Sequence, residues 1–492
     1  MNFTKHIIIS FFLLQVFFNQ AMSQTEGSLE KFLFDHYDQY LEKSISHQYL
    51  KLEDIQPIID KLDEDKTFKV KVLGESVEGR KINLLKLGKG KTNVLLWSQM
   101  HGNEPTATMA LMDMFNFFLA SDELDEFREK VLEECTLYFV PMLNPDGAEK
   151  YQRRNALDFD INRDAQRLQS PEAKILKKIR DKTNADFGFN LHDQSTLYSA
   201  GKSANQASIS FLAPAYNYEK DVNDVRGNAM KIIGILDETL QQFIPGHIAK
   251  YDDTFEPRAF GDNIQKWGTS TILVESGGYP NDPEKQHLRK MNFILLLKAL
   301  EAISTKSYEK ETIERYEAIP FNKRYLFDLI VRNAKVEVQG KKYIMDIGVN
   351  YHQFHENGDK AFKYKGYIVE LGDMSTFYGY EEIDAQEQEV FPGLISEDTF
   401  ENQEELNETK INELLSKGIT FAKVKNHEKS KGLPQVPINL VLSESTPKSA
   451  IELGSPANFT IGKGKKKKTA VINGFIYQIG EKDNNIPNTV IY

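Results

Sequence analysis

The sequence predicts an α/β fold, a mixed β-sheet flanked by helices on both faces, followed by a smaller β-rich C-terminal accessory domain. Three observations support this. Short apolar runs alternate with helical patterns between residues 66 and 305, which is typical of a sheet covered by helices on both faces. Several side chains that can bind metals or transfer protons directly follow apolar runs. In α/β sheets, ligand-binding sites lie at the carboxyl ends of the strands. After residue 306 most runs alternate as β-strands do.

The elements of the first part are predicted from apolar periodicity and capping residues. The expected strands are Phe68–Leu73, Ile82–Leu87, Val94–Trp97, Thr136–Val140, Phe187–Leu191 and Thr271–Val274. A helix is expected after Glu104, with Pro105 in its first turn, and another at Ser170-Pro171, where serine caps and proline begins the helix. Two more are expected over about Val222–Phe243 and Glu284–Ile303.

The first 23 residues have the pattern of a signal peptide. Lys5 and His6 precede an apolar run, Ile7–Phe18, and small residues stand before a cut after Ser23. The alternative is a buried or membrane-anchoring helix, for which the run is short. We therefore expect an exported protein, secreted or periplasmic, with no transmembrane segment after signal removal. Residues 24–65 are polar and helix-prone, and we expect a helical lead-in there.

The charge and the rest of the sequence limit the possible partners and the domain organisation. The 492-residue chain carries a net charge of −11, which argues against a nucleic-acid partner. Residues 306–492 are predicted to form the accessory domain, with one helix-like stretch at Gln403–Leu415. The run Lys465–Lys468 is expected to be a solvated turn between strands, with an anion-binding spot as the alternative. The single cysteine, Cys135, is expected to be buried in a strand.

Two histidines and a glutamate are candidate metal ligands. His101 and Glu104 stand three apart where a predicted strand turns into a helix, and His192 ends another predicted strand. Each could be an ordinary buried or surface residue on its own. Together they supply two imidazoles and one carboxylate, which is a catalytic zinc set with one position left open.

Other polar residues complete a candidate active site. Glu275 follows a buried strand and precedes two glycines, which suits a general base, although a salt-bridged strand-end glutamate is the plainer alternative. The pattern Arg153-Arg154-Asn155, followed by Asp160-Ile161-Asn162-Arg163, can be solvated or can hold anions. Asp160 is suited to hold the far nitrogen of a ligand histidine.

Taken together, these motifs resemble the M14 zinc carboxypeptidases, also called the carboxypeptidase A or funnelin family. The resemblance covers roughly residues 65–305. It rests on motifs whose order and spacing agree with that family: Gly74-x-Ser76-x-Glu78-Gly79-Arg80, His101-Gly102-Asn103-Glu104, Asn144-Pro145-Asp146-Gly147, Arg153-x-Asn155-Ala156, Asp160-Ile161-Asn162-Arg163, Leu191-His192 and Glu275.

The resemblance implies roles for individual residues. His101, Glu104 and His192 would bind zinc, with Asp160 behind a ligand, and Glu275 would act as general base and acid. Arg153 would polarise the scissile carbonyl, and Asn162 and Arg163 would grip the terminal carboxylate. Tyr251 lies near the place of the family's mobile tyrosine, but the segment after Tyr251 departs from the family's common pattern. Arg258, within that segment, is a further candidate substrate contact.

The expected activity is hydrolysis of C-terminal peptide bonds in peptides or proteins. Three alternatives stay open at this point: cleavage of murein stem peptides, peptide binding by an inactive peptidase scaffold, and hydrolysis of small acylated amino acids. The residues from 306 onward do not match the transthyretin-like domain that often follows this catalytic unit.

Overall fold

The structure, a computed structural model, describes residues 28–355, 360–427, 436–442, 445, 447–464, 466–481 and 489–492. The predicted signal peptide, residues 1–23, and Lys465 of the lysine run lie outside the described residues. The chain divides into two compact units. The first runs to Gln194 and continues over Ile209–Ile319, and the second comprises Ser195–Ser208 and Pro320–Tyr492.

An eight-stranded mixed sheet forms the centre of the first unit. Its strands follow the order β1-β2-β4-β3-β5-β9-β7-β8. Their bounds are β1 Lys69–Glu75, β2 Lys81–Gly88, β3 Thr92–Ser98, β4 Cys135–Val140, β5 Phe187–Asp193, β7 Ile209–Leu212, β8 Ile248–Lys250 and β9 Ser270–Ser276. All six expected strands are present, and Cys135 is buried in β4. The short strands β7 and β8 were not predicted.

The three strands that end in candidate site residues lie side by side. β3 and β5 are parallel neighbours, as are β5 and β9. Their carboxyl ends therefore meet at one edge of the sheet, which is where the sequence places its candidate residues. In the parallel register, His192 on β5 stands opposite Glu275 on β9.

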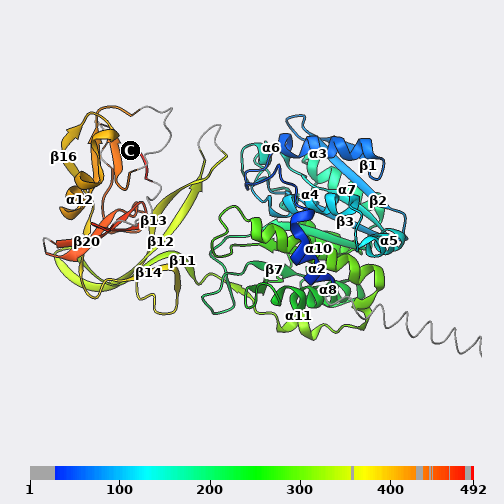
Figure 1. Cartoon of the computed structure of the whole chain (residues 1–492). Helices are drawn as coiled ribbons and strands as arrows, with labels where there is room; N and C mark the ends of the chain where they lie inside the picture. Colours follow the sequence, from blue (N-terminus) through cyan, green and yellow to red (C-terminus); the bar gives the residue numbers. More distant parts are fainter. Residues whose placement is uncertain are drawn as a thin grey trace, which may run out of the picture. The chain divides into compact units, whose positions relative to one another are not determined.

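Helices cover both faces of this sheet (Figure 1). One hydrophobic core joins one sheet face to α2, α3, α4, α5, α8 and α10, and a second joins the other face to α7 and α9. The bounds are α2 Leu29–His36, α3 Leu52–Asp65, α4 Thr106–Leu119, α5 Asp125–Glu134, α7 Pro171–Thr183, α8 Asp224–Gln241, α9 Phe260–Lys266 and α10 Gln286–Thr305. The predicted cap of α7 is present, since the Ser170 hydroxyl accepts from the amide of Ala173 at 3.2 Å. Pro105 is the N-cap of α4, one residue before the first turn in which it was expected.

The residues expected to form a lead-in are part of the first core. Leu33 of α2 and Ile55 of α3 are fully buried in it. The segment between these helices contributes to a buried polar cluster, because the Glu42 amide donates to Asp113 at 2.7 Å. Asp113 is paired with Arg289, and both side chains are completely buried. Residues 28–65 are therefore part of the first unit and cover one side of its core.

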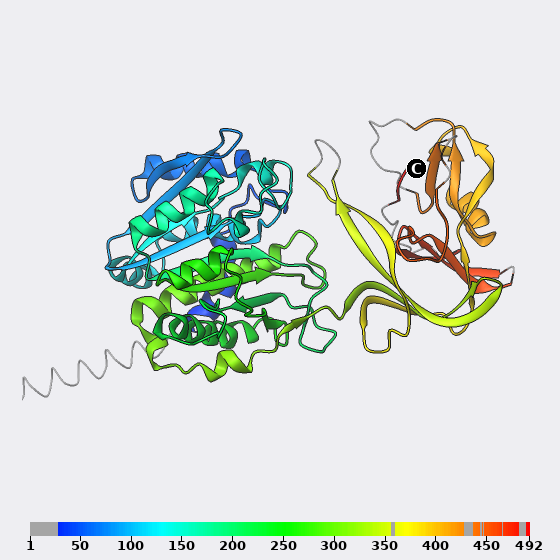
Figure 2. The same ribbon diagram turned by 180° about the vertical axis from the view of Figure 1, so that it is seen from behind.

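The second unit is rich in β-structure. Strands β11 Leu326–Val338, β12 Lys341–Phe354 and β13 Lys363–Gly372 pair antiparallel, and Figure 2 shows the long curved hairpin of β11 and β12 in yellow-green. The same sheet continues through β15 Glu389–Pro392, β19 Phe459–Lys463, β20 Lys466–Ile472 and β21 Phe475–Gln478, with β14 Tyr378–Asp384 also paired to β11. Three parallel strands, β16 Leu394–Phe400, β17 Ile419–Val424 and β18 Asn439–Leu442, form a smaller sheet that shares a core with α12 Glu408–Ser416.

The division of the chain differs from the expected boundary at residue 306 in two ways. The connector with α11 Glu314–Ala318 belongs to the first unit, which ends at Ile319. The segment Ser195–Ser208 belongs to the second unit, since β6 Ser199–Ala200 pairs antiparallel with β10 Asn322–Lys323. Among the described residues, no helix is long and apolar enough to cross a membrane.

Candidate metal centre and active site

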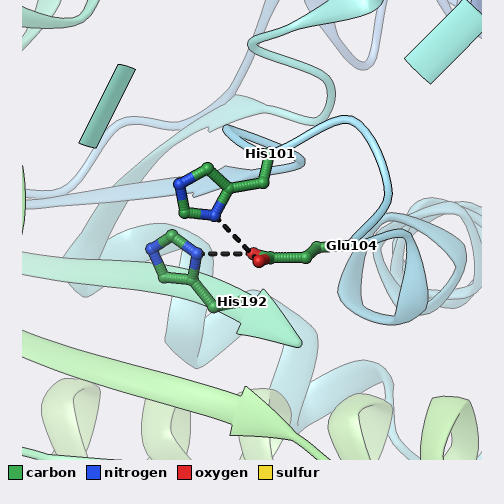
Figure 3. A group of neighbouring side chains, drawn as sticks. All are labelled: His101, Glu104 and His192. Carbon is green, nitrogen blue, oxygen red and sulfur yellow. Dashed lines mark hydrogen bonds and ion pairs between the residues drawn. The ribbon is translucent and has the colours of Figure 1, made fainter. Parts of the chain in front are cut away.

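Three of the predicted ligands meet at one point at the carboxyl edge of the first sheet (Figure 3). His101 lies in the loop after β3, Glu104 two residues before the start of α4, and His192 on β5. Nδ1 of His101 is 2.8 Å from Oε1 of Glu104, and Nδ1 of His192 is 2.7 Å from Oε2 of the same carboxylate. One ligand atom from each residue lies within 4.8 Å of the other two, and all three residues are buried. The geometry thus brings together the three residues that the sequence predicts as zinc ligands.

The loop that carries His101 and Glu104 packs against the short helix α6 Pro145–Glu149. Gly102 lies so close to Gly147 that a Cβ on Gly102 would stand 1.9 Å from the carbonyl carbon of Gly147, so only glycine fits there. The Asn144 side chain accepts from the amide of Gly147 at 2.9 Å and fixes the turn. The two motifs are therefore in direct backbone contact.

Asp146 secures this short helix, a role that was not predicted from the sequence, where Asp146 was only expected to lie in a turn. Its buried carboxylate accepts from the hydroxyl of Ser76 at 2.7 Å and the amide of Glu78 at 2.9 Å. It also pairs with Arg80 at 2.7 Å. The motif at residues 74–80 thus supports the loop of His101 and Glu104 indirectly, through Asp146.

Asp160 orients two residues of the site, as predicted for one of them. Its Oδ1 lies 3.1 Å from Nε2 of His101, and its Oδ2 accepts from Nε and Nη2 of Arg153 at 3.1 and 3.0 Å. An Nε2–H that donates to Asp160 leaves a lone pair on Nδ1 of His101, the atom that faces Glu104. The contact therefore fixes the tautomer that a metal needs.

Arg153 lies against the ligand cluster. Its Nη1 is 3.0 Å from Nδ1 of His101 and 3.2 Å from Oε1 of Glu104, while 42% of its side chain is exposed. A cationic donor at the open side of the cluster can reach an oxygen of a bound substrate. Its role in polarising the scissile carbonyl stays a prediction.

The charges in the cluster favour a cation at its centre. Burial opposes ionisation of Glu104, but His101 and His192 outweigh it and hold the pKa of that carboxyl well below its usual range. Burial likewise opposes protonation of His101, but Glu104 and Asp160 raise the pKa of its imidazole. A lone pair on Nδ1 and a carboxylate oxygen 2.8 Å apart repel each other unless a positive charge lies between them. Two imidazoles and one carboxylate so arranged fit a zinc ion.

Glu275 has the environment of a general base. It stands opposite His192 in the sheet, and its Oε2 is buried without a hydrogen-bond partner among the described residues. Burial raises the pKa of Glu275 to about 8, an effect that Glu104 and Asp193 reinforce while His192 and Arg153 oppose it. An unpartnered carboxylate oxygen with a raised pKa can both take and return a proton near neutral pH.

The predicted carboxylate grip is only partly assembled. Asn162 is buried, and its Oδ1 accepts from the amide of Phe260 at 2.8 Å, which ties the turn η2 Ile161–Arg163 to α9. Arg163 lies 3.6 Å from Glu256, and Arg258 binds the same carboxylate through two nitrogens at 3.0 and 2.8 Å. These two arginines lower the pKa of Glu256 to about 2, Arg258 contributing most. Glu256 was not predicted, and its carboxylate contacts both arginines.

Tyr251 lies directly after β8, and its amide donates to the carbonyl of Phe211 at 2.8 Å. Its substrate-binding role stays a prediction.

A buried polar cluster next to His192 was also not predicted from the sequence. Asp193 accepts from the hydroxyl of Thr106 at 2.6 Å and pairs with Lys285 at 3.0 Å. Lys285 also donates to the carbonyl of Ser276 at 3.3 Å, one residue after Glu275. The cluster therefore ties the ends of β5 and β9 to the start of α4. The position of Asp193 after a predicted ligand was the one signal available, and Lys285 offered none.

Comparisons with known proteins agree with this geometry. The family model described as zinc carboxypeptidase (Peptidase M14) matches residues 55–225. Carboxypeptidase 2 of Trichophyton tonsurans is 26% identical over 129 residues, which is 24% of this chain and 23% of that protein. Carboxypeptidase SOL1 of Arabidopsis thaliana is 31% identical over 93 residues, covering 17% of this chain and 19% of that protein. The chain thus spans about a quarter or less of the length of these relatives.

Solved structures are also similar to the chain. A metallo-carboxypeptidase from Burkholderia cenocepacia aligns with a TM-score of 0.41 at 16% identity, over 53% of this chain and 70% of the other. A metallo-carboxypeptidase from Pseudomonas aeruginosa, in complex with (2-guanidinoethylmercapto)succinic acid, aligns with a TM-score of 0.39 at 18% identity, over 53% and 70%. The family match spans the three candidate ligands and Asp160, and Glu275 lies beyond it. Residues 55–225 are therefore similar to the M14 family of zinc carboxypeptidases.

Proposed function

We propose that this chain is an exported, zinc-dependent metallocarboxypeptidase that removes C-terminal residues from peptides or proteins. One observation carries the proposal. His101, Glu104 and His192 meet at a single point, and Glu275 stands on the adjacent strand in register with His192. The match of residues 55–225 to the zinc carboxypeptidase family adds the expectation of a bound metal, and the chemistry of these ligands favours zinc.

The residues divide the reaction among them. His101, Glu104 and His192 would hold the zinc ion, which when bound polarises a carbonyl and lowers the pKa of water. Glu275 takes a proton from the attacking water through its unpartnered Oε2 and returns it to the leaving amine. Arg153 stabilises the negative charge that develops on the carbonyl oxygen, and Asp160 keeps that guanidinium in place.

Recognition of a free C-terminus is assigned to the arginines beside the site. Arg163 and Arg258 share the carboxylate of Glu256, so they form an anion-binding pair that a terminal carboxylate can enter. Asn162 fixes the turn that presents Arg163, and Tyr251 is proposed as an additional substrate contact. A grip on the terminal carboxylate restricts cleavage to the last peptide bond, because it sets which carbonyl reaches the metal.

The proposal is tested with paired peptides that differ only in a free or an amidated C-terminus. The zinc-loaded wild type is expected to release the last residue of the free-acid peptides and to spare the amidated ones. Glu275→Gln is expected to keep its zinc and lose turnover by at least about a thousandfold. A Glu275→Gln protein with full zinc content and substantial turnover would refute the assignment of the base.

The same experiment separates the other candidates. A zinc-free, inert wild type that still binds peptides would indicate an inactive binding scaffold. Release of an acyl group from small acylated amino acids, without cleavage of longer peptides, would indicate an amidohydrolase. No observation favours murein stem peptides over ordinary peptide C-termini.

A further inference from the structure

A groove with an apolar floor and a rim of lysines lies in the first unit, formed by the edge strands β1 and β2, Tyr138 of β4, and α7. It encloses about 390 Å³, which is within the size range of small-molecule sites. Its apolar lining comes chiefly from Leu73, Leu84, Tyr138, Ile175 and Ile179. Figure 1 shows β1, β2 and α7 as neighbouring elements.

The rim of the groove is purely cationic. Five lysines line it, and no aspartate or glutamate does: Lys69, Lys71, Lys86, Lys178 and Lys182. None of the five is ion-paired within 4.0 Å to a carboxylate of the described chain, although the protein as a whole carries a net charge of −11. In an acidic protein such a concentration of unpaired positive charge selects an anion.

The sheet register places two of these charges against each other. Lys69 on β1 stands directly opposite Lys86 on β2, and Lys86 in turn stands opposite Tyr138 on β4. Like charges in directly opposed positions of a sheet destabilise it. An anion between Lys69 and Lys86 would relieve the repulsion.

The apolar floor is recessed. Leu84 and Ile179 are buried, and Leu73, Tyr138 and Ile175 are half-buried at the margin of the core between the sheet and α7. A surface that inserts into a bilayer instead presents protruding apolar side chains. The recess therefore fits one chain of a free amphiphile better than a membrane surface.

From these observations we infer that the groove binds a free single-chain amphiphile with a compact anionic head, of which a fatty-acid carboxylate is the simplest case. The alkyl chain lies over Leu84 and Ile179, and the head lies between Lys69 and Lys86. The site is independent of the proposed peptidase activity, because none of its lining residues belongs to the metal centre.

Calorimetric titration of the full chain with octanoate, decanoate and dodecanoate, each below its critical micelle concentration, tests the inference. We expect saturable binding of one molecule per chain, with affinity rising about threefold to fourfold per added methylene until the groove is filled. Binding that is absent, or that does not depend on chain length, would overturn it.

Charge variants test the position of the head. Lys69→Gln/Lys86→Gln is expected to weaken dodecanoate binding about tenfold and to leave the melting temperature unchanged or raised. The matched control is Lys81→Gln/Lys174→Gln, which removes the same charge from exposed positions of β2 and α7 outside the groove, and it is expected to bind as the wild type does. Equal losses in both double variants would contradict the site.

Vesicles distinguish a free amphiphile from a membrane as the source of the anion. Co-flotation with phosphatidylglycerol vesicles, without any binding of monomeric dodecanoate, would overturn the proposal and indicate a membrane-facing surface. Binding of monomeric dodecanoate that dodecanol fails to match supports it, because dodecanol has the same chain length without the charge.

Discussion

Replacing Asp160 by asparagine isolates the residue that links His101 to Arg153. In the native site one carboxylate oxygen serves Nε2 of His101 at 3.1 Å and the amide of Asn162 at 3.0 Å, and the other serves Arg153 at 3.1 and 3.0 Å. Asparagine has nearly the same shape but only one oxygen, so one of the two sides loses its acceptor and the charge disappears. A hydrogen bond to a charged group contributes about 1.5–3 kcal/mol.

That energy converts to a loss of about ten- to a hundredfold in zinc affinity, in line with the effect of other residues that support metal ligands. The assay titrates the metal-free protein with zinc against a chromophoric chelator. At saturating zinc, kcat/KM should still be reduced, because Arg153 is no longer held against the cluster. Asp158→Asn, an exposed change in the same loop, should leave both quantities unchanged. A zinc dissociation constant within twofold of the wild type would refute the assigned role of Asp160.

Three further changes test neighbouring parts of the account. Glu256→Gln should lower KM for free-acid peptides up to about fivefold by freeing Arg163, and leave amidated peptides unaffected; an unchanged KM would contradict the competition. Lys285→Met should cost about 3 kcal/mol of unfolding free energy in urea, because it leaves Asp193 buried and unpaired; a loss below about 0.5 kcal/mol would show that the pair does not stabilise the fold. Burial raises the pKa of Asp262 from 3.8 to about 7, so the folded protein loses stability as pH rises from about 4 to 7, and Asp262→Asn should be the more stable protein at pH 8, by at most ~4 kcal/mol, but not at pH 4; equal gains at both pH values would contradict the burial argument.

The cluster of His101, Glu104 and His192 could be predicted from the sequence because each of these residues has a recognisable local pattern. His101 and Glu104 lie three residues apart at a strand-to-helix corner, and His192 and Glu275 each lie at the end of an apolar strand. The rule that parallel strands share a carboxyl edge then brings distant residues together. The structure shows this convergence through the β3-β5-β9 arrangement.

Ion pairs between residues that are distant in sequence, or that no local pattern marks, could not be predicted in this way. Lys285 lies 92 positions after Asp193. Its own backbone is in the left-handed conformation, just before α10, and no local sequence pattern identifies it as the partner of Asp193. Glu256 read as one charge among several, and only the folded chain shows that it joins Arg163 to Arg258.

The unit boundary was missed for a related reason. A strand of two residues, Ser199–Ala200, is too short to be recognised by periodicity, yet its pairing with Asn322–Lys323 places the segment after His192 in the second unit. The helices before residue 65 read as a lead-in because their polar faces dominate the composition. Their buried faces, with Leu33 and Ile55, are recognised only against the core they cover.

Anomalous scattering at the zinc edge, from crystals of the zinc-loaded protein, tests the central claim most directly. We expect a single strong peak within about 2.0–2.2 Å of Nδ1 of His101, a carboxylate oxygen of Glu104 and Nδ1 of His192. No peak at this position, or a zinc ion bound by other residues while these three remain unliganded, would contradict it.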